Sequence, residues 1–196
     1  MKKLILTLSI AFMLFCSCTS NDTLETKNSS SRISSVLNEK NYESQKLMYQ
    51  LLSKEEKHQI WTDKIDILVL DSSLSDQQIN LLNDLKNHLN NNLFDKTQNN
   101  DNREVFKTIY TKDFLSKAKN LFSYKYVYEN FFTINGNISL SKTGTPPLPV
   151  CSCNQGSIYS CAMVSTDCKP TDKCRTDSDG CGFLGMFECN GNCYLN

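Results

Sequence analysis

Cysteine is missing from most of this chain: none occurs between Cys18 and Cys151. Proline is missing from residues 20–145 as well, and proline is the residue that most disrupts the interior of a helix. Neither sign of charge is in excess, because 21 basic residues balance 21 acidic ones, so we expect no nucleic-acid partner. After the N-terminal residues, no stretch reaches the ~18 apolar residues that a membrane-spanning helix needs. These absences favour a helical region before Cys151.

Motifs that carry catalysis are missing too. The chain contains no G-x-S-x-G, no H-E-x-x-H and no phosphate-binding loop, each of which sets reactive groups at a fixed spacing. His58 and His88 have polar neighbours and no partner with which to form a nucleophile–base pair. We therefore expect two surface histidines, no enzymatic activity, and neither a cofactor nor a metal ion.

The N-terminus has the pattern of an export signal. Residues 1–3 carry two lysines and residues 4–15 are apolar, a length typical of a signal peptide and too short for a membrane span. Small Ser17 precedes Cys18, which predicts a lipoprotein-type signal with Cys18 as the lipid-modified first residue. Cleavage after Ser20 by an ordinary signal peptidase is the alternative. Either cut leaves eight cysteines, an even number, in an oxidising compartment.

Composition divides the chain into five parts. Residues 18–35 have few apolar side chains to bury, and three prolines near residue 147 favour an extended segment that a processing protease can reach. The predicted parts are a signal peptide (1–17), a flexible tether (18–35), a helical domain (36–140), a proline-rich linker (141–150) and a cysteine-rich C-terminal module (151–196).

Helix signals fill the predicted helical domain. Ser53 and Ser75 each precede a Glu or Gln by three residues, which is the pattern of a capping box. Thr111 is expected to cap a third helix, residues 90–102 to form a connection, and residues 124–134 to be either helix or strand. Helical spacing of the apolar residues predicts one buried face on each of the first two helices: Trp61, Ile65, Leu68 and Val69, then Leu82, Leu85, Leu89 and Leu93. The predicted fold class is a mostly α protein, a small helical bundle followed by a loop-dominated, disulfide-rich module.

The spacing of the C-terminal cysteines favours disulfides over zinc. Structural zinc sites pair their ligands two to four residues apart and repeat the pair further along the chain, whereas only Cys189 and Cys193 have such a spacing here. So short a segment rarely folds on an apolar core alone. We therefore predict four disulfides of undetermined pairing among Cys151, Cys153, Cys161, Cys168, Cys174, Cys181, Cys189 and Cys193.

The C-terminal module resembles a known family. The motifs C-S-C at 151–153, Gly180-Cys181-Gly182 and Cys189-Asn190-Gly191-Asn192 are similar to those of the bacteriocin fulvocin C-related proteins. The resemblance is dense over residues 151–196 and weaker over the helical part. It implies a secreted antimicrobial module behind a signal peptide and a helical region.

An apolar cluster at residues 183–187 is the most unusual feature of the module. Three basic and five acidic side chains give residues 151–196 a net charge of −2, so the module is not drawn to anionic lipid by charge. The cluster could insert at an interface or fill a receptor groove. We expect instead that it forms the small core of the module.

Two functions follow from these patterns. The first is an exported, lipid-anchored precursor of a bacteriocin-like peptide, which proteolysis in the linker releases toward an envelope target of neighbouring bacteria. In the alternative, the chain is a surface lipoprotein whose cysteine-rich tail is a permanent binding or stability module. A third idea is self-protection, in which the helical domain binds the tail. In each case the N-terminal lipid would attach the chain to the membrane of the bacterial envelope.

Overall fold

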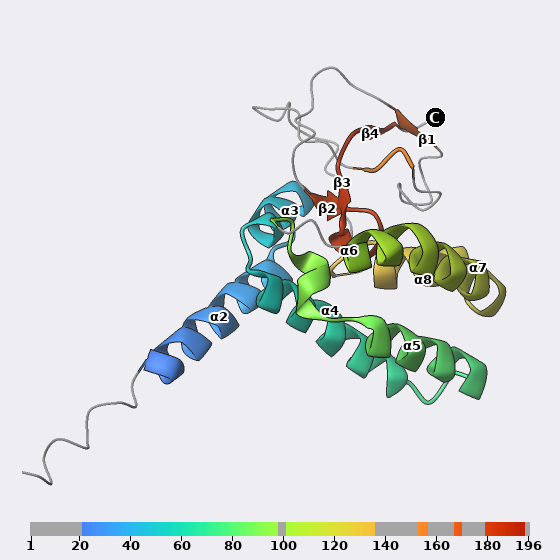
Figure 1. Ribbon diagram of the computed structural model, residues 1–196, viewed down its shortest axis with the longest axis horizontal. Coiled ribbons are helices and arrows are strands. Elements are labelled where there is room, and N and C mark those ends of the chain that lie inside the picture. The colour runs from blue at the N-terminus through green and yellow to red at the C-terminus, as the bar shows by residue number, and fades with distance from the viewer. Residues whose placement is uncertain (1–20, 98–100, 136–152, 157–166, 170–178, 195–196) are drawn as a thin grey trace, which may run out of the picture.

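The computed structural model describes residues 21–97, 101–135, 153–156, 167–169 and 179–194. Within them the fold class is the predicted one, a mostly helical protein with a small C-terminal segment of strands and disulfides (Figure 1). The predicted signal peptide, Cys18 and the linker lie outside the described residues. The helices are α2 (Asn21–Asn38), α3 (Tyr42–Gln50), α4 (Lys54–Val69), α5 (Asp76–His88), η2 (Asn91–Phe94), α6 (Asp101–Val105), η3 (Phe106–Tyr110), α7 (Thr111–Leu121) and α8 (Tyr124–Phe131).

Both predicted capping boxes start helices. At the start of α4, the Ser53 N–H donates to Glu56 Oε2 at 2.7 Å, and the Glu56 N–H donates to Ser53 Oγ at 3.2 Å. Ser75 and Gln78 repeat the arrangement at the start of α5. Each box satisfies two amide groups that would otherwise lack a partner at the first turn.

The two predicted apolar faces meet in one core. Trp61 and Ile65 of α4 are buried, and Leu82 and Leu85 of α5 are buried in the same cluster. Leu89 and Leu93 extend this cluster beyond the end of α5, because the short helix η2 turns Leu93 back toward the core. Figure 1 shows α4 and α5 lying side by side.

The helix around Thr111 begins earlier than predicted. The segments α6, η3 and α7 follow one another without a break, so Thr111 lies inside a helix and not at its N-cap. Its Oγ1 donates to the carbonyl of Phe106 at 2.9 Å, five residues back, within the π-helical turn η3. A threonine hydroxyl can bond a preceding carbonyl as well as a following N–H, and the sequence pattern does not separate the two.

The aromatic residues 124–134, which fitted either helix or strand, begin with helix α8. Ser123 caps it by accepting from the Tyr126 N–H at 3.1 Å. At the other end, Lys64 of α4 donates to the carbonyls of Glu129 and Thr133 at 2.8 and 2.7 Å. A lysine there satisfies carbonyls that a helix end leaves open.

The predicted flexible tether is wrong for residues 21–35, because they belong to helix α2. Its first half extends away from the other helices in Figure 1, whereas Ile33 and Val36 near its end are buried. These two residues are three positions apart and share one helical face. A composition argument missed the helix because two apolar contacts are enough to dock its C-terminal turns.

The C-terminal segment forms two small antiparallel ladders. Strand β1 (Asp167–Lys169) pairs with β4 (Asn192–Tyr194), and β2 (Asp179–Cys181) pairs with β3 (Phe187–Glu188), with η4 (Phe183–Gly185) between β2 and β3. Disulfide bonding is confirmed by two bridges, Cys153–Cys168 and Cys181–Cys189. The other predicted disulfide cysteines, Cys151, Cys161, Cys174 and the side chain of Cys193, lie outside the described part of the structure.

The capping box of α4 is open to a direct test. Ser53→Ala removes the acceptor for the Glu56 N–H, and we expect the free energy of unfolding to fall by about 1 kcal/mol, measured by urea denaturation. Ser116→Ala is the control, since Ser116 is exposed in the middle of α7. Alanine is the best helix former, so this change should be neutral or slightly stabilising. Equal losses in the two variants would contradict the cap.

Candidate functional site

Residues 179–189 form a disulfide-closed loop, called here the C-terminal hairpin, that docks on the helices. The apolar residues Phe183, Leu184 and Met186 of this hairpin are buried in the same cluster as Trp61 and Leu85 of the helical domain. Figure 1 shows β2 and β3 against the helices. The expectation that residues 183–187 form a core of the C-terminal module alone is therefore corrected: the core that they enter is mostly helical.

Phe183 is the central contact of this docking. It is 1 % exposed, and four phenylalanines from η3, α7 and the end of α8 surround its ring. Their centroids lie 5.2 Å (Phe114), 5.9 Å (Phe132), 6.0 Å (Phe131) and 6.4 Å (Phe106) from that of Phe183. These separations are in the range that aromatic pairs prefer. One hairpin residue thus completes an aromatic cluster built from distant helices.

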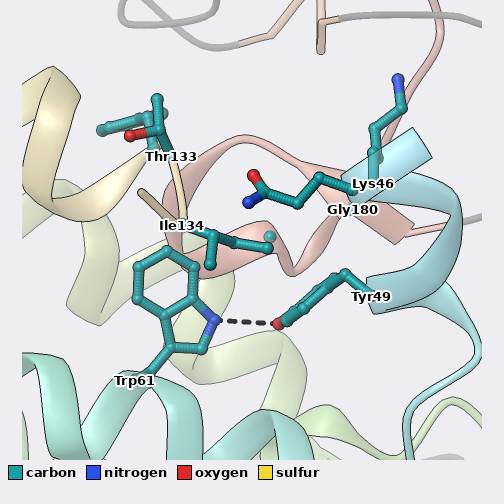
Figure 2. Close-up of a pocket in the computed structure, with 9 residues that line it drawn as sticks. Lys46, Tyr49, Trp61, Thr133, Ile134 and Gly180 are labelled. Carbon is teal, nitrogen blue, oxygen red and sulfur yellow. Dashed lines mark hydrogen bonds between the residues drawn. The ribbon is translucent and has the colours of Figure 1, made fainter. Parts of the chain in front are cut away.

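A chain of buried hydrogen bonds fixes the depth of the hairpin. Tyr49 of α3 accepts from Trp61 Nε1 at 2.9 Å (Figure 2). Its hydroxyl donates to the backbone carbonyl of Leu184 at 3.2 Å. All three residues are at most 1 % exposed, and burial raises the pKa of Tyr49 well above its ordinary value. The phenol therefore stays protonated and serves as both donor and acceptor between the helices and the hairpin.

Gly185 allows this close approach. Its φ is +62°, and a Cβ at this position would lie 2.9 Å from Cε1 of Tyr49. Leu184 before it also has a positive φ, 52°, which is uncommon for a residue with a side chain. The loop is therefore shaped to turn its backbone carbonyl toward Tyr49.

A buried ion pair holds the first strand of the hairpin. Arg103 of α6 bonds Asp179 Oδ2 at 2.5 Å, and both side chains are more than four-fifths buried. The same guanidinium donates to the carbonyl of Met186 at 3.1 Å and, through Nε, to that of Leu93 at 2.9 Å. Burial raises the pKa of Asp179, while Arg103 and Lys96, 3.7 Å away, oppose that rise. A buried carboxylate needs such partners to remain charged.

Further cations surround the same carboxylate. The pKa of Lys57 is lowered by burial and then by Lys96, and Asp179 acts against this change. The ammonium of Lys107 lies 5.3 Å from the ring centre of Phe187. The surface that receives the hairpin, called here the docking surface, therefore combines an apolar floor with a basic rim, and Asp179 supplies the opposite charge. The floor consists of Phe106, Phe114, Phe131 and Phe132, and the rim of Lys57, Lys96, Arg103 and Lys107.

The disulfide Cys181–Cys189 closes the base of the hairpin. Both cysteines are buried, at 3 % and 2 % exposure, and the bridge joins the ends of the loop that carries Phe183. Asn154, which follows Cys153 of the second bridge, donates to the carbonyl of Glu188 at 2.8 Å. The two disulfide-bonded parts of the C-terminal segment are thereby connected beside the docking surface.

The cavity beside the hairpin is too small for a substrate. Its volume is ≈ 20 Å³, which holds about one water molecule. Among the described residues, no group of three histidine, cysteine or acidic side chains is placed to hold a metal ion. Tyr49, Trp61, Lys46 and Thr133 are among the residues around the cavity in Figure 2.

The two histidines lie apart from the docking surface described above. His58 is half-buried on α4 near Thr62, and His88 is exposed at the end of α5, stacked on Tyr110 with ring centres 4.2 Å apart. The expectation that this chain is not an enzyme stays a prediction. Sequence reasoning singled out the apolar cluster but missed Tyr49 and Arg103, for which no local pattern gives a signal.

No family model, curated protein or solved structure matches this chain in comparisons with known proteins. The resemblance of residues 151–196 to the fulvocin C-related family therefore stays a prediction.

Removal of the Phe183 ring tests whether the core is shared. We expect Phe183→Ala to lower the free energy of unfolding by about 3–5 kcal/mol, because it leaves a cavity in a packed core. The measurement is urea denaturation followed by the circular dichroism of the helices. Phe187→Ala is the control, because Phe187 is only half-buried in the same hairpin, and its loss should be smaller. An unchanged helical transition in Phe183→Ala would show that the hairpin does not belong to the helical core.

The hydroxyl of Tyr49 can be removed without changing the shape of the core. Tyr49→Phe leaves the Trp61 N–H and the Leu184 carbonyl without this partner, so we expect a loss of about 1–3 kcal/mol, measured through the fluorescence of the single tryptophan. Tyr126→Phe is the matched control: its hydroxyl is buried and has no hydrogen-bond partner in the described structure. That change should be neutral or stabilising, and an equal loss in both variants would contradict the role of Tyr49.

Proposed function

We propose that this chain is an exported, lipid-anchored protein of the bacterial cell envelope whose cysteine-rich segment is a permanent part of the folded unit. The two disulfides of the described residues are typical of a protein that folds in an oxidising, extracytoplasmic compartment. In the described part of the chain, no helix has the length and apolarity needed to cross a bilayer. The N-terminal signal pattern, with Cys18 as the lipid-modified residue, supports the anchor.

The core shared by the hairpin and the helices is the observation that supports a permanently docked cysteine-rich segment. Withdrawal of the hairpin would expose Phe183, Leu184 and Met186, each at most 1 % exposed, and burial of such a side chain contributes about 1.5–3 kcal/mol. It would also remove the Asp179 carboxylate from Arg103 and leave a cavity beside four phenylalanines. A tail with these contacts acts first as a stabilising module of the helical domain.

A bacteriocin-like precursor is the second candidate, and the buried apolar loop favours it in one respect. A toxin precursor has to hide its membrane- or receptor-seeking surface in the producing cell, and the helices cover residues 183–186. Cleavage in the proline-rich residues 141–150 would then begin release toward neighbouring bacteria. The family resemblance supports this candidate, whereas the shared core weighs against rapid release.

Fractionation of producing cells separates the two candidates. We expect a single full-length species in the membrane fraction, with acyl mass on Cys18 and a gain of two hydrogen atoms per disulfide on reduction. Cys18→Ser should move the protein into the soluble or extracellular fraction, whereas the control Cys16→Ser should leave it in the membrane. A small extracellular fragment beginning near Val150 would instead support the released bacteriocin-like peptide and call for killing assays.

A further inference from the structure

The docking surface for the C-terminal hairpin has the features of a binding site for a separate molecule. We propose that the helical domain binds in trans the C-terminal hairpin of a second copy of this chain. The inference rests on the docking geometry alone, so it applies to a permanent module and to a cleaved precursor alike. Four properties of the hairpin support the proposal: its fixed shape, its attachment through side chains, its covalent connection to the helical part and its charge.

The hairpin is preorganised for binding. The Cys181–Cys189 disulfide joins its two ends, and β2 pairs with β3 within it. Its shape is thus set by bonds inside residues 179–189, and less conformational freedom is lost when it docks. A hairpin that arrives from another copy brings the same shape.

The hairpin attaches through side chains of the helical domain. Its described contacts there include the aromatic cluster around Phe183, the Tyr49 bond to the Leu184 carbonyl, and the Arg103 bonds to Asp179 and Met186. In the described residues, both sheets pair strands of the C-terminal segment only, so no ladder ties the hairpin to the helices. Every such contact can form equally well with a hairpin on another chain.

The connection between the two parts does not by itself decide which chain supplies the hairpin. The described helical part reaches Asn135, and the described cysteine-rich part begins at Cys153 and is tied to the hairpin by the Asn154 bond to the Glu188 carbonyl. A covalent connection between two binding parts raises the effective concentration of one near the other to the order of millimolar. A second copy competes with the hairpin of the same chain once its local concentration approaches that value, as in the exchange of identical elements between protomers.

Charge makes the surface selective. Arg103 and Lys96 contact Asp179, and Lys57 and Lys107 lie close enough to favour its charged form. An empty site would present this basic rim around an apolar floor, and opposite charge steers and orients a partner. The fitting partner is thus a disulfide-closed hairpin with a buried carboxylate, Asp179, four residues before a Phe-Leu-Gly-Met run, which this chain itself carries.

A specific cut in the full-length protein tests the proposal. A recognition site for a sequence-specific protease is placed within residues 142–149, and the purified, oxidised protein is cut in its folded state. We expect the two fragments to elute together at concentrations on the order of micromolar. When cut protein labelled with a heavy isotope is mixed with unlabelled cut protein, native mass spectrometry should detect pairs of mixed origin. Separate elution of the fragments would overturn the proposal.

A second mixing experiment distinguishes slow dissociation of the hairpin from an inability of the hairpin to exchange between copies. The two cut preparations are also mixed in urea below the unfolding midpoint and then dialysed together, which speeds hairpin release. Mixed pairs after this treatment support binding in trans. Pairs that remain of single origin after it would overturn the proposal, because they would show that the site accepts a hairpin only during the folding of its own chain.

A charge variant with a matched control tests the selectivity. In the cut protein, Asp179→Asn should weaken the pairing about tenfold or more and reduce its dependence on salt, since a buried charge pair is lost. Glu188→Gln lies in the same hairpin but is exposed, and its effect should stay within about twofold. Equal effects of the two substitutions would overturn the assignment of the basic rim as the selective element. The isotope-mixing experiment uses the cut protein without either substitution, so it still decides the proposal if Asp179→Asn does not fold.

Discussion

Burial of the C-terminal hairpin in the helical core is the contact on which the rest of this structure depends. A short cysteine-rich segment has too few apolar residues to fold on a core of its own, and here Phe183, Leu184 and Met186 enter the core of the helices instead. The helices gain in return, because the ring of Phe183 packs against both Phe114 and Phe131. Neither part has a complete core without the other.

Polar groups around this contact determine its geometry more than its strength. Apolar burial is non-directional, so an apolar loop could settle on the helices in several ways. Tyr49 and Arg103 each bond a hairpin carbonyl, and Arg103 also pairs with Asp179. Since a buried polar group that loses its partner destabilises the fold, arrangements that separate these pairs are excluded. The result is one defined position for the hairpin.

Local patterns in the sequence predict the helices far better than the docking. The capping boxes at Ser53 and Ser75 and the apolar faces of α4 and α5 involve residues within a few turns. The structure has both, although Leu68 and Val69 at the end of α4 are only partly buried. The prediction that Thr111 is an N-cap was wrong, because its hydroxyl can bond a preceding carbonyl as well as a following N–H. The prediction of a flexible tether was wrong for residues 21–35, because α2 needs only a small apolar face to dock. The pairings of Tyr49 with Leu184 and of Arg103 with Asp179 join residues far apart in sequence. No periodicity encodes such pairings, so a single sequence could indicate that residues 183–187 are buried but not where.

The disulfide and the shared core together link folding to the redox state of the compartment. The Cys181–Cys189 bridge lies at the base of the loop that carries Phe183, so its reduction would give that loop more freedom to lose on docking. The aromatic cluster of η3, α7 and α8 would then be completed less often, although those helices contain no cysteine. The aromatic cluster of the helices depends on the Cys181–Cys189 bridge, whereas the bridge restrains the hairpin whether or not the helices are present. An oxidising environment thus favours a complete helical core as well as an ordered cysteine-rich segment, because both depend on the same docked hairpin.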